Sequence, residues 1–255
     1  MAGRKIILTL CAIGLSVVSF GQACGPAFSP FETELASTSD PGSTSLNYLS
    51  ESEREACVDA GIEPFSGPVN SIPALVAYIN TLPRPVQIHC FVANLPRPLY
   101  VQAGSSARSA QPSPGPSDPR IFIKSGNLVM GVVPAGLAVN TLEISELTGG
   151  GLGEKAEFRF PIVEAAISEA TGLDHIRFGS GTSCGLCHQG ESYSRALGGS
   201  MAFKSNVLQF AANERITIPE LRSHARRCRS TNDQSERCLL FRALFDGDSL
   251  RPTEY

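Results

Sequence analysis

The sequence predicts an α+β fold, in which an antiparallel, β-sandwich-like region precedes a small helical region held by a disulfide. Residues 51–161 contain several short β-rich runs separated by clusters of Gly, Pro and Ser. From residue 162 onward helix-forming segments dominate, and Cys228 and Cys238 flank a polar loop between two of them. With 42% hydrophobic residues in 255, the chain has ample material for a core.

Residues 1–23 have the layout of a signal peptide. Arg4 and Lys5 precede an apolar run over residues 6–20, and a short stretch of small and polar residues follows it. As a helix this run spans roughly 22 Å, which is shorter than the ~30 Å hydrocarbon core of a bilayer. The sequence therefore predicts export and removal of residues 1–23 rather than a permanent membrane span.

The residues at the expected cleavage point resemble the lipobox of bacterial lipoproteins. Ala23 and Cys24 fit that motif, whereas Gly21 stands where leucine is usual. The resemblance implies that Cys24 becomes the N-terminal residue, carries fatty-acyl chains such as palmitate, and anchors the protein to a membrane of the cell envelope, in the periplasm or at the cell surface. Small residues at positions 21 and 23 also suit ordinary signal peptidase, so plain secretion is the alternative. Residues 24–50, rich in Ser, Thr and Pro, are predicted to form a flexible tether.

Within residues 51–161, one helix is predicted at 73–82, with Ser71 as its N-cap and Pro83 at its end. Strands are predicted at 86–92, 99–102, 120–123, 128–133, 141–144 and 156–161. The glycine-rich residues 149–153 are predicted as a hairpin turn rather than a phosphate-binding loop, because a strand-like segment follows them. His89 is expected to be an ordinary surface or core histidine, since the sequence places no second histidine or carboxylate cluster near it.

The region 162–255 is predicted to contain helices at 163–170, 219–229 and 237–245. Eight cysteines occur in the chain, of which Cys11 belongs to the signal peptide and Cys24 to the lipid anchor. The even remainder favours pairing in an oxidising compartment. Cys228–Cys238 is the expected first disulfide and Cys57–Cys90 the second, although connectivity does not follow from sequence alone.

The segment with the strongest chemical signature is Cys184-Gly-Leu-Cys187-His188, a C-x-x-C-H motif. It resembles the haem-attachment site of c-type cytochromes. Two thiols at this spacing reach the two vinyl groups of a haem, while the adjacent histidine binds the iron. The resemblance implies one covalent haem c, attached through Cys184 and Cys187 with His188 as axial ligand, and single-electron transfer to a redox partner in the cell envelope.

Other readings of these cysteines remain open. One is a thioredoxin-like redox pair, and another is a zinc site that adds Cys228 and either Cys238 or His224. A third is a haem-free envelope lipoprotein with structural disulfides, which binds a partner or ligand through its β-rich region.

The second axial ligand of a haem iron would be Met201 or His224. We favour His224, because the predicted helix 219–229 places it on the same face as Leu221, Ala225 and Cys228.

Composition and motifs exclude several functions. A net charge of −3 without basic runs gives no support for nucleic-acid binding. The sequence contains no H-E-x-x-H or P-loop motif. The sequence therefore predicts an electron carrier or a binding protein in preference to an enzyme.

Overall fold

The computed structural model describes residues 47–58, 67–105 and 112–254, apart from residues 198 and 248. The predicted signal peptide, Cys24 and nearly all of the predicted tether lie outside these residues. None of the described helices is long and apolar enough to cross a membrane.

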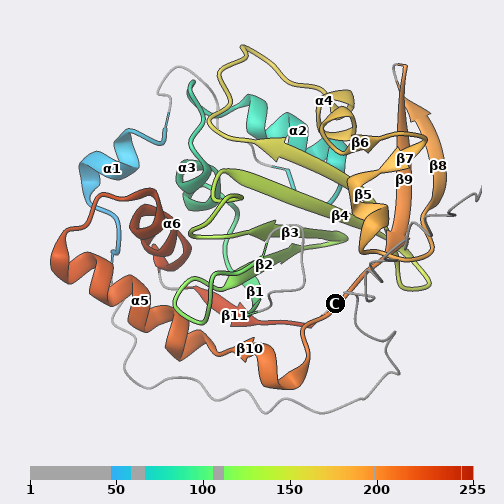
Figure 1. Ribbon diagram of the computed structural model, residues 1–255. Coiled ribbons are helices and arrows are strands. Elements are labelled where there is room, and N and C mark those ends of the chain that lie inside the picture. Colours follow the sequence, from blue (N-terminus) through green and yellow to red (C-terminus); the bar gives the residue numbers. More distant parts are fainter. Residues whose placement is uncertain (1–46, 59–66, 106–111, 198, 248, 255) are drawn as a thin grey trace, which may run out of the picture.

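A single large sheet forms the centre of the molecule (Figure 1). Its strands follow the order β10-β1-β2-β3-β4-β5-β9-β8, and β11 pairs with β1. All neighbours are antiparallel except β1 and β11. The strands of this sheet are β1 (Leu99–Gly104), β2 (Arg120–Ser125), β3 (Leu128–Val132), β4 (Thr141–Gly149), β5 (Leu152–Arg159), β8 (Ser192–Leu197), β9 (Ser200–Asn206), β10 (Arg215–Ile216) and β11 (Leu250–Pro252). A separate two-stranded sheet joins β6 (Arg177–Phe178) to β7 (Gly181–Thr182).

Helices bury one face of this sheet in a continuous hydrophobic core. The helices are α1 (Glu51–Glu55), α2 (Ile72–Asn80), α3 (Ile88–Ala93), α4 (Glu169–His175), α5 (Ile218–Thr231) and α6 (Glu236–Phe245), with 3-10 turns η1 (Ser183–Leu186) and η2 (Ala212–Glu214). Ile79, Phe91 and Phe241 from three of the helices belong to the same core as Met130 and Phe158 from the sheet. Burial of side chains of this size is worth about 1.5–3 kcal/mol each, so packing holds these short helices in place.

The mixed α/β architecture with a large, mainly antiparallel sheet agrees with the predicted α+β class. The predicted sandwich is not observed, because the described strands β1 to β5 and β8 to β11 belong to one continuous hydrogen-bonded sheet. The region 162–255 is also not purely helical, since β8 and β9 extend the sheet beyond β5. In β9 the exposed Met201 lies between the buried Ser200 and Ala202, and this alternation is a strand signal that the sequence prediction passed over.

Two predicted segments are wrong. Residues 86–92 contain helix α3 instead of a strand, and the backbone carbonyl of Phe91 accepts a hydrogen bond from the Tyr78 hydroxyl at 2.7 Å. Residues 163–168 are not helical, because Asn80 bonds both the N–H and the carbonyl of Ile167 at 2.9 Å and holds them extended. Helix α4 begins only at Glu169, after the N-cap Ser168. In both places contacts with distant residues override local propensity.

The predictions that rest on local signals agree with the structure. Helix α2 has Ser71 as its N-cap, and α5 and α6 match the two predicted C-terminal helices. Gly149, Gly150 and Gly151 turn the β4–β5 hairpin with φ of 88°, 61° and 74°, a region of backbone conformation that favours glycine.

Both expected disulfides are present. Cys228–Cys238 joins α5 to α6, and Cys57–Cys90 joins the residues after α1 to α3.

Candidate functional site

The C-x-x-C-H motif forms one tight turn after β7. The N–H groups of Cys187 and His188 both donate to the carbonyl of Cys184, at 3.1 and 2.8 Å. Thr182 caps the turn, since its hydroxyl accepts from the Gly185 N–H at 3.3 Å. Cys184 and Cys187 are the free cysteines of the described part of the chain, whereas the other four described cysteines form disulfides.

The carboxylate of Glu191 holds this turn through hydrogen bonds to Thr182. The carboxylate accepts from the Thr182 N–H at 3.1 Å and from the Thr182 hydroxyl. A Cβ at Gly185 would lie 2.7 Å from the carboxylate atoms of Glu191, closer than real contacts allow. The middle of the motif therefore needs a glycine as long as Glu191 occupies this place.

The imidazole of His188 is held by the backbone of β9. Its Nδ1 atom lies 2.7 Å from the carbonyl oxygen of Asn206. A carbonyl only accepts, so Nδ1 carries the hydrogen and Nε2 keeps its lone pair. Burial, together with the positive charge of Lys155, lowers the pKa of His188 to about 4. At neutral pH the ring is uncharged and suited to bind a metal ion through Nε2.

Lys155 lies beneath the motif on β5 and is only 4% exposed. Its Nζ donates to the Ser145 hydroxyl at 2.9 Å and to the Asn206 carbonyl at 3.5 Å. Burial lowers the pKa of Lys155 to about 8 and raises that of Cys184. Cys184 is therefore a protonated thiol at neutral pH, which disfavours the thioredoxin-like reading, because such pairs need a stabilised thiolate.

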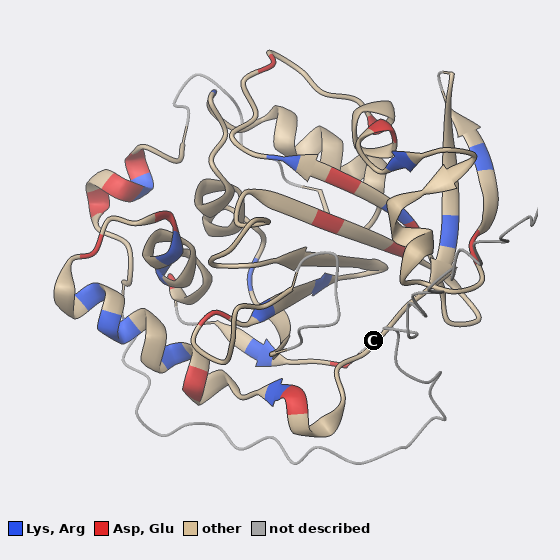
Figure 2. Ribbon diagram, in the orientation of Figure 1, with Lys and Arg blue, Asp and Glu red and all other residues tan. Residues whose placement is uncertain are grey.

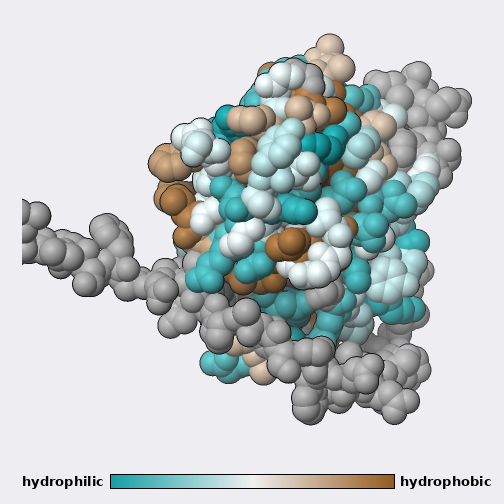
Figure 3. Space-filling view, turned by 90° about the vertical axis from the view of Figure 1, so that its right-hand side faces the viewer, coloured by the Kyte–Doolittle hydropathy of each residue, from teal (hydrophilic) through white to brown (hydrophobic). Residues whose placement is uncertain are grey.

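Apolar side chains around the motif are unusually exposed. Leu186, inside the motif, is 70% exposed, and Phe178 on β6 is 62% exposed. Tyr193 on β8 is exposed as well. Figure 3 views the side of the molecule to the right in Figure 1 and shows hydrophobic atoms among the hydrophilic ones on that side.

The structure does not bring either predicted second ligand to the motif. His224 stacks on Phe241 at 5.2 Å between ring centroids, and α5 lies against β11, which pairs with β1. Five strand spacings separate β1 from β9, or about 24 Å. Figure 1 shows α5 and the β8–β9 hairpin at opposite sides of the molecule. In this structure His224 therefore packs between α5 and α6 and does not lie beside His188.

Met201 is closer to the motif but not beside it. It lies at the far end of β9 from Asn206, roughly 16 Å away at the rise of a strand. The zinc reading also fails, because Cys228 and Cys238 are bonded to each other at the α5–α6 edge.

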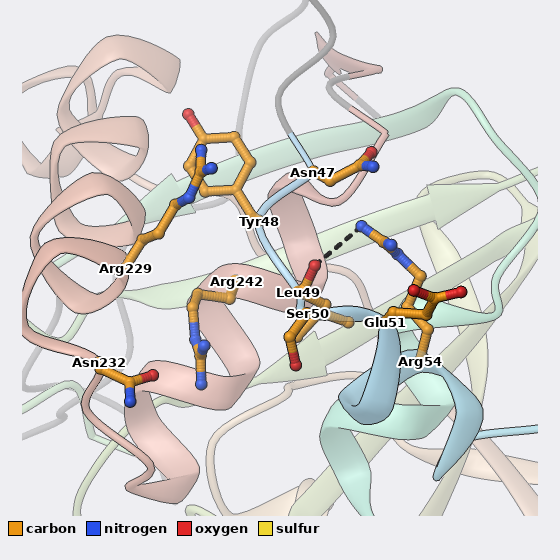
Figure 4. A pocket seen from close by; sticks show the side chains of 9 residues that line it. All are labelled: Asn47, Tyr48, Leu49, Ser50, Glu51, Arg54, Arg229, Asn232 and Arg242. Carbon is orange, nitrogen blue, oxygen red and sulfur yellow. Dashed lines mark hydrogen bonds between the residues drawn. The ribbon is translucent and has the colours of Figure 1, made fainter.

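A separate pocket lies away from the motif, between the start of the described chain and helices α5 and α6 (Figure 4). Its lining residues are Asn47, Tyr48, Leu49, Ser50, Glu51, Arg54, Arg229, Asn232 and Arg242. Arg54 is paired with Asp246 at 2.6 Å and also donates to the carbonyl of Leu49, the bond drawn in Figure 4. Arg242 is paired with Glu53 at 2.7 Å. Arg54 and Arg242 are therefore engaged in ion pairs that join separate parts of the fold.

Acidic and basic residues are interspersed over the molecule, and several basic residues lie along helix α5 (Figure 2). Arg226, Arg227 and Arg229 are exposed there. This basic helix lies at the edge away from the C-x-x-C-H turn.

Four residues of the site were missed from the sequence. Thr182 and Glu191 bind the turn, and Asn206 and Lys155 surround the His188 ring. Only Thr182 carried a usable signal, as a capping residue three positions before Gly185.

Comparisons with known proteins found no counterpart. No family model, no curated protein and no solved structure matches this chain.

Proposed function

We propose that this protein is an exported, membrane-anchored carrier of one covalent c-type haem that transfers single electrons in the cell envelope. The observation that carries the proposal is the hydrogen bond from His188 Nδ1 to the Asn206 carbonyl, 2.7 Å long, within a C-x-x-C-H turn. A metal-binding histidine ordinarily uses one ring nitrogen for the metal ion and donates the N–H of the other to a carbonyl or carboxylate. This hydrogen bond fixes the tautomer and the orientation of the ring.

The residues of the turn fit this cofactor. Cys184 and Cys187 are unpaired thiols, as thioether formation requires, and each would add its S–H across one vinyl group. His188 is kept neutral by burial and would bind the iron through Nε2. Bound haem supplies an iron that gains and loses one electron. Leu186 and Phe178 offer exposed apolar surface beside the turn.

Haem attachment is tested by producing the protein with its own signal sequence in a host that matures c-type cytochromes. We expect covalent haem that survives denaturing electrophoresis and gives the pyridine haemochrome spectrum of a c-type haem. The double variant Cys184→Ser/Cys187→Ser should lose the stain. The matched control Cys228→Ser/Cys238→Ser, which also removes two cysteines, should keep it. A colourless wild-type protein in which both motif thiols react with an alkylating reagent contradicts the proposal and favours the haem-free envelope lipoprotein.

The membrane anchor is proposed from the lipobox-like residues before Cys24. Acyl chains on Cys24 would hold the protein at a membrane. A clickable fatty acid should label the wild type and leave Cys24→Ser unlabelled. Release of unlabelled wild-type protein into the periplasm or medium would show that plain secretion is the correct reading.

A further inference from the structure

A second group of metal-ligating side chains lies at the Cys57–Cys90 disulfide. One ligand atom each from Cys57, His89 and Cys90 lies within 4.8 Å of the other two. Cys57 follows α1, whereas His89 and Cys90 belong to α3. Chain folding has therefore placed a histidine against two sulfur atoms that come from separate segments.

We propose that reduction of this disulfide creates a binding site for a thiophilic transition metal ion, of which Zn²⁺ is the simplest example, with Cys57, Cys90 and His89 as ligands. Two thiolates and one imidazole are a known zinc ligand set, and the fourth position then holds water or a substrate. The site is independent of the C-x-x-C-H turn and of any haem.

The two cysteines are held together by more than their sulfur bond. The side-chain Nδ2 of Asn94 donates to the carbonyl of Cys57 at 2.7 Å and to the carbonyl of Cys90 at 3.0 Å. This bridge does not involve the sulfur atoms, so reduction of the disulfide removes neither its donor nor its acceptors. Both cysteines are buried, which keeps the two thiols facing a confined space.

Glu236 lies next to the ring of His89. Its Oε2 lies 3.3 Å from His89 Nδ1, so the carboxylate can accept the ring hydrogen and leave the other ring nitrogen free to bind a metal ion. The His89 side chain is 13% exposed and the Glu236 side chain 43% exposed. The group therefore reaches the surface on the Glu236 side, where a water molecule can enter.

A dithiol can serve as the reductant of the Cys57–Cys90 disulfide. The dithiol passes two electrons and two protons to the disulfide, which becomes two thiols, and is itself oxidised to a disulfide. Metal binding then displaces the two thiol protons, so affinity rises with pH.

The test uses the full mature chain carrying Cys184→Ser and Cys187→Ser, so that the C-x-x-C-H turn cannot bind metal. This protein is reduced with a phosphine and titrated with Co²⁺, whose thiolate charge-transfer and visible bands report the ligands. We expect one equivalent bound, with the bands of a four-coordinate site, and displacement by Zn²⁺. Additional His89→Ala should weaken binding, and Glu236→Gln should weaken it by roughly 10–100-fold, as the loss of an orienting partner does.

The control is the Cys228–Cys238 disulfide, because α5 carries His224 as well as Cys228. Additional Cys57→Ser/Cys90→Ser should abolish the bands, whereas His224→Ala should leave them unchanged. Circular dichroism of the reduced protein with and without Zn²⁺ shows whether the fold is kept. Bands that survive Cys57→Ser/Cys90→Ser would place the metal at Cys228 and Cys238 and overturn the proposal. Absence of binding, or a reduced chain that stays unfolded with Zn²⁺ present, overturns it as well.

Discussion

Lys155 and His188 share one hydrogen-bond acceptor, the backbone carbonyl oxygen of Asn206. Lys155 Nζ lies 3.5 Å from this oxygen and His188 Nδ1 lies 2.7 Å from it. The buried ammonium group of Lys155 and the imidazole of His188 therefore lie close together. The positive charge of Lys155 opposes protonation of the His188 ring.

The first prediction concerns the pKa of His188 in haem-free protein, produced without the signal peptide. NMR titration should give a pKa near the expected value of about 4, with burial as the main cause and Lys155 as the next. Lys155→Met should raise this pKa, whereas Lys204→Met on β9 should leave it unchanged. An unchanged His188 pKa in Lys155→Met would show that the charge of Lys155 does not reach the ring.

Stability should follow the same titration. The pKa of His188 in the folded protein lies below the ordinary 6.5, so the folded state resists protonation that the unfolded state accepts. The contribution of His188 to the free energy of unfolding is therefore complete above about pH 6.5 and is lost as the pH falls toward about 4. Urea unfolding across this range should show a shallower decline for His188→Gln than for the wild type.

A second prediction follows from the distance between α5 and the motif. If haem is bound, His224→Ala should leave the visible and near-infrared spectrum of the oxidised protein unchanged. The reason is that His224 lies on α5, which packs against β11 near the opposite edge of the sheet from the motif. Met201→Ala is the informative companion, since Met201 shares β9 with the carbonyl that holds His188. A spectral change in His224→Ala would contradict the arrangement described here.

The sequence was informative where a signal is local. Pro219 marks the first turn of α5, and Gly149 to Gly151 mark the β4–β5 turn. The C-x-x-C-H motif could be read directly because its residues are five consecutive positions of the chain.

Contacts between distant residues left no such signal. The carbonyl of Asn206 holds His188, but a backbone group does not depend on residue type, so nothing in the sequence marked it. Glu236 lies 147 residues from His89, and the sequence alone gave no reason to place them together. Likewise, α3 is apolar and partly β-branched, and its packing against α6 is a contact that the local sequence does not announce.

The third prediction compares the two disulfides in metal-free protein. Cys228–Cys238 closes a loop with a sequence separation of 10 and Cys57–Cys90 one of 33. In the chain-entropy model, their removal costs about 3 and about 4 kcal/mol respectively. Urea unfolding of Cys228→Ser/Cys238→Ser and Cys57→Ser/Cys90→Ser should show the larger loss for the second pair. The reverse order would mean that packing around the α5–α6 bridge outweighs loop length.

The last prediction tests the contact between Gly185 and Glu191. A Cβ at position 185 would lie 2.7 Å from the Glu191 carboxylate, which is itself held by the N–H and hydroxyl of Thr182. Gly185→Ala should therefore displace Glu191 and cost about 1–3 kcal/mol, as overpacking does. Glu191→Ala removes both the clamp and the obstacle, so Gly185→Ala should cost much less in that background. A double-mutant cycle by urea unfolding of haem-free protein should give a coupling energy on the order of 0.5–3 kcal/mol. Leu186→Ala, at the exposed neighbouring position, should change stability by less than about 0.5 kcal/mol. Strictly additive costs of Gly185→Ala and Glu191→Ala would mean that the carboxylate does not lie under the turn.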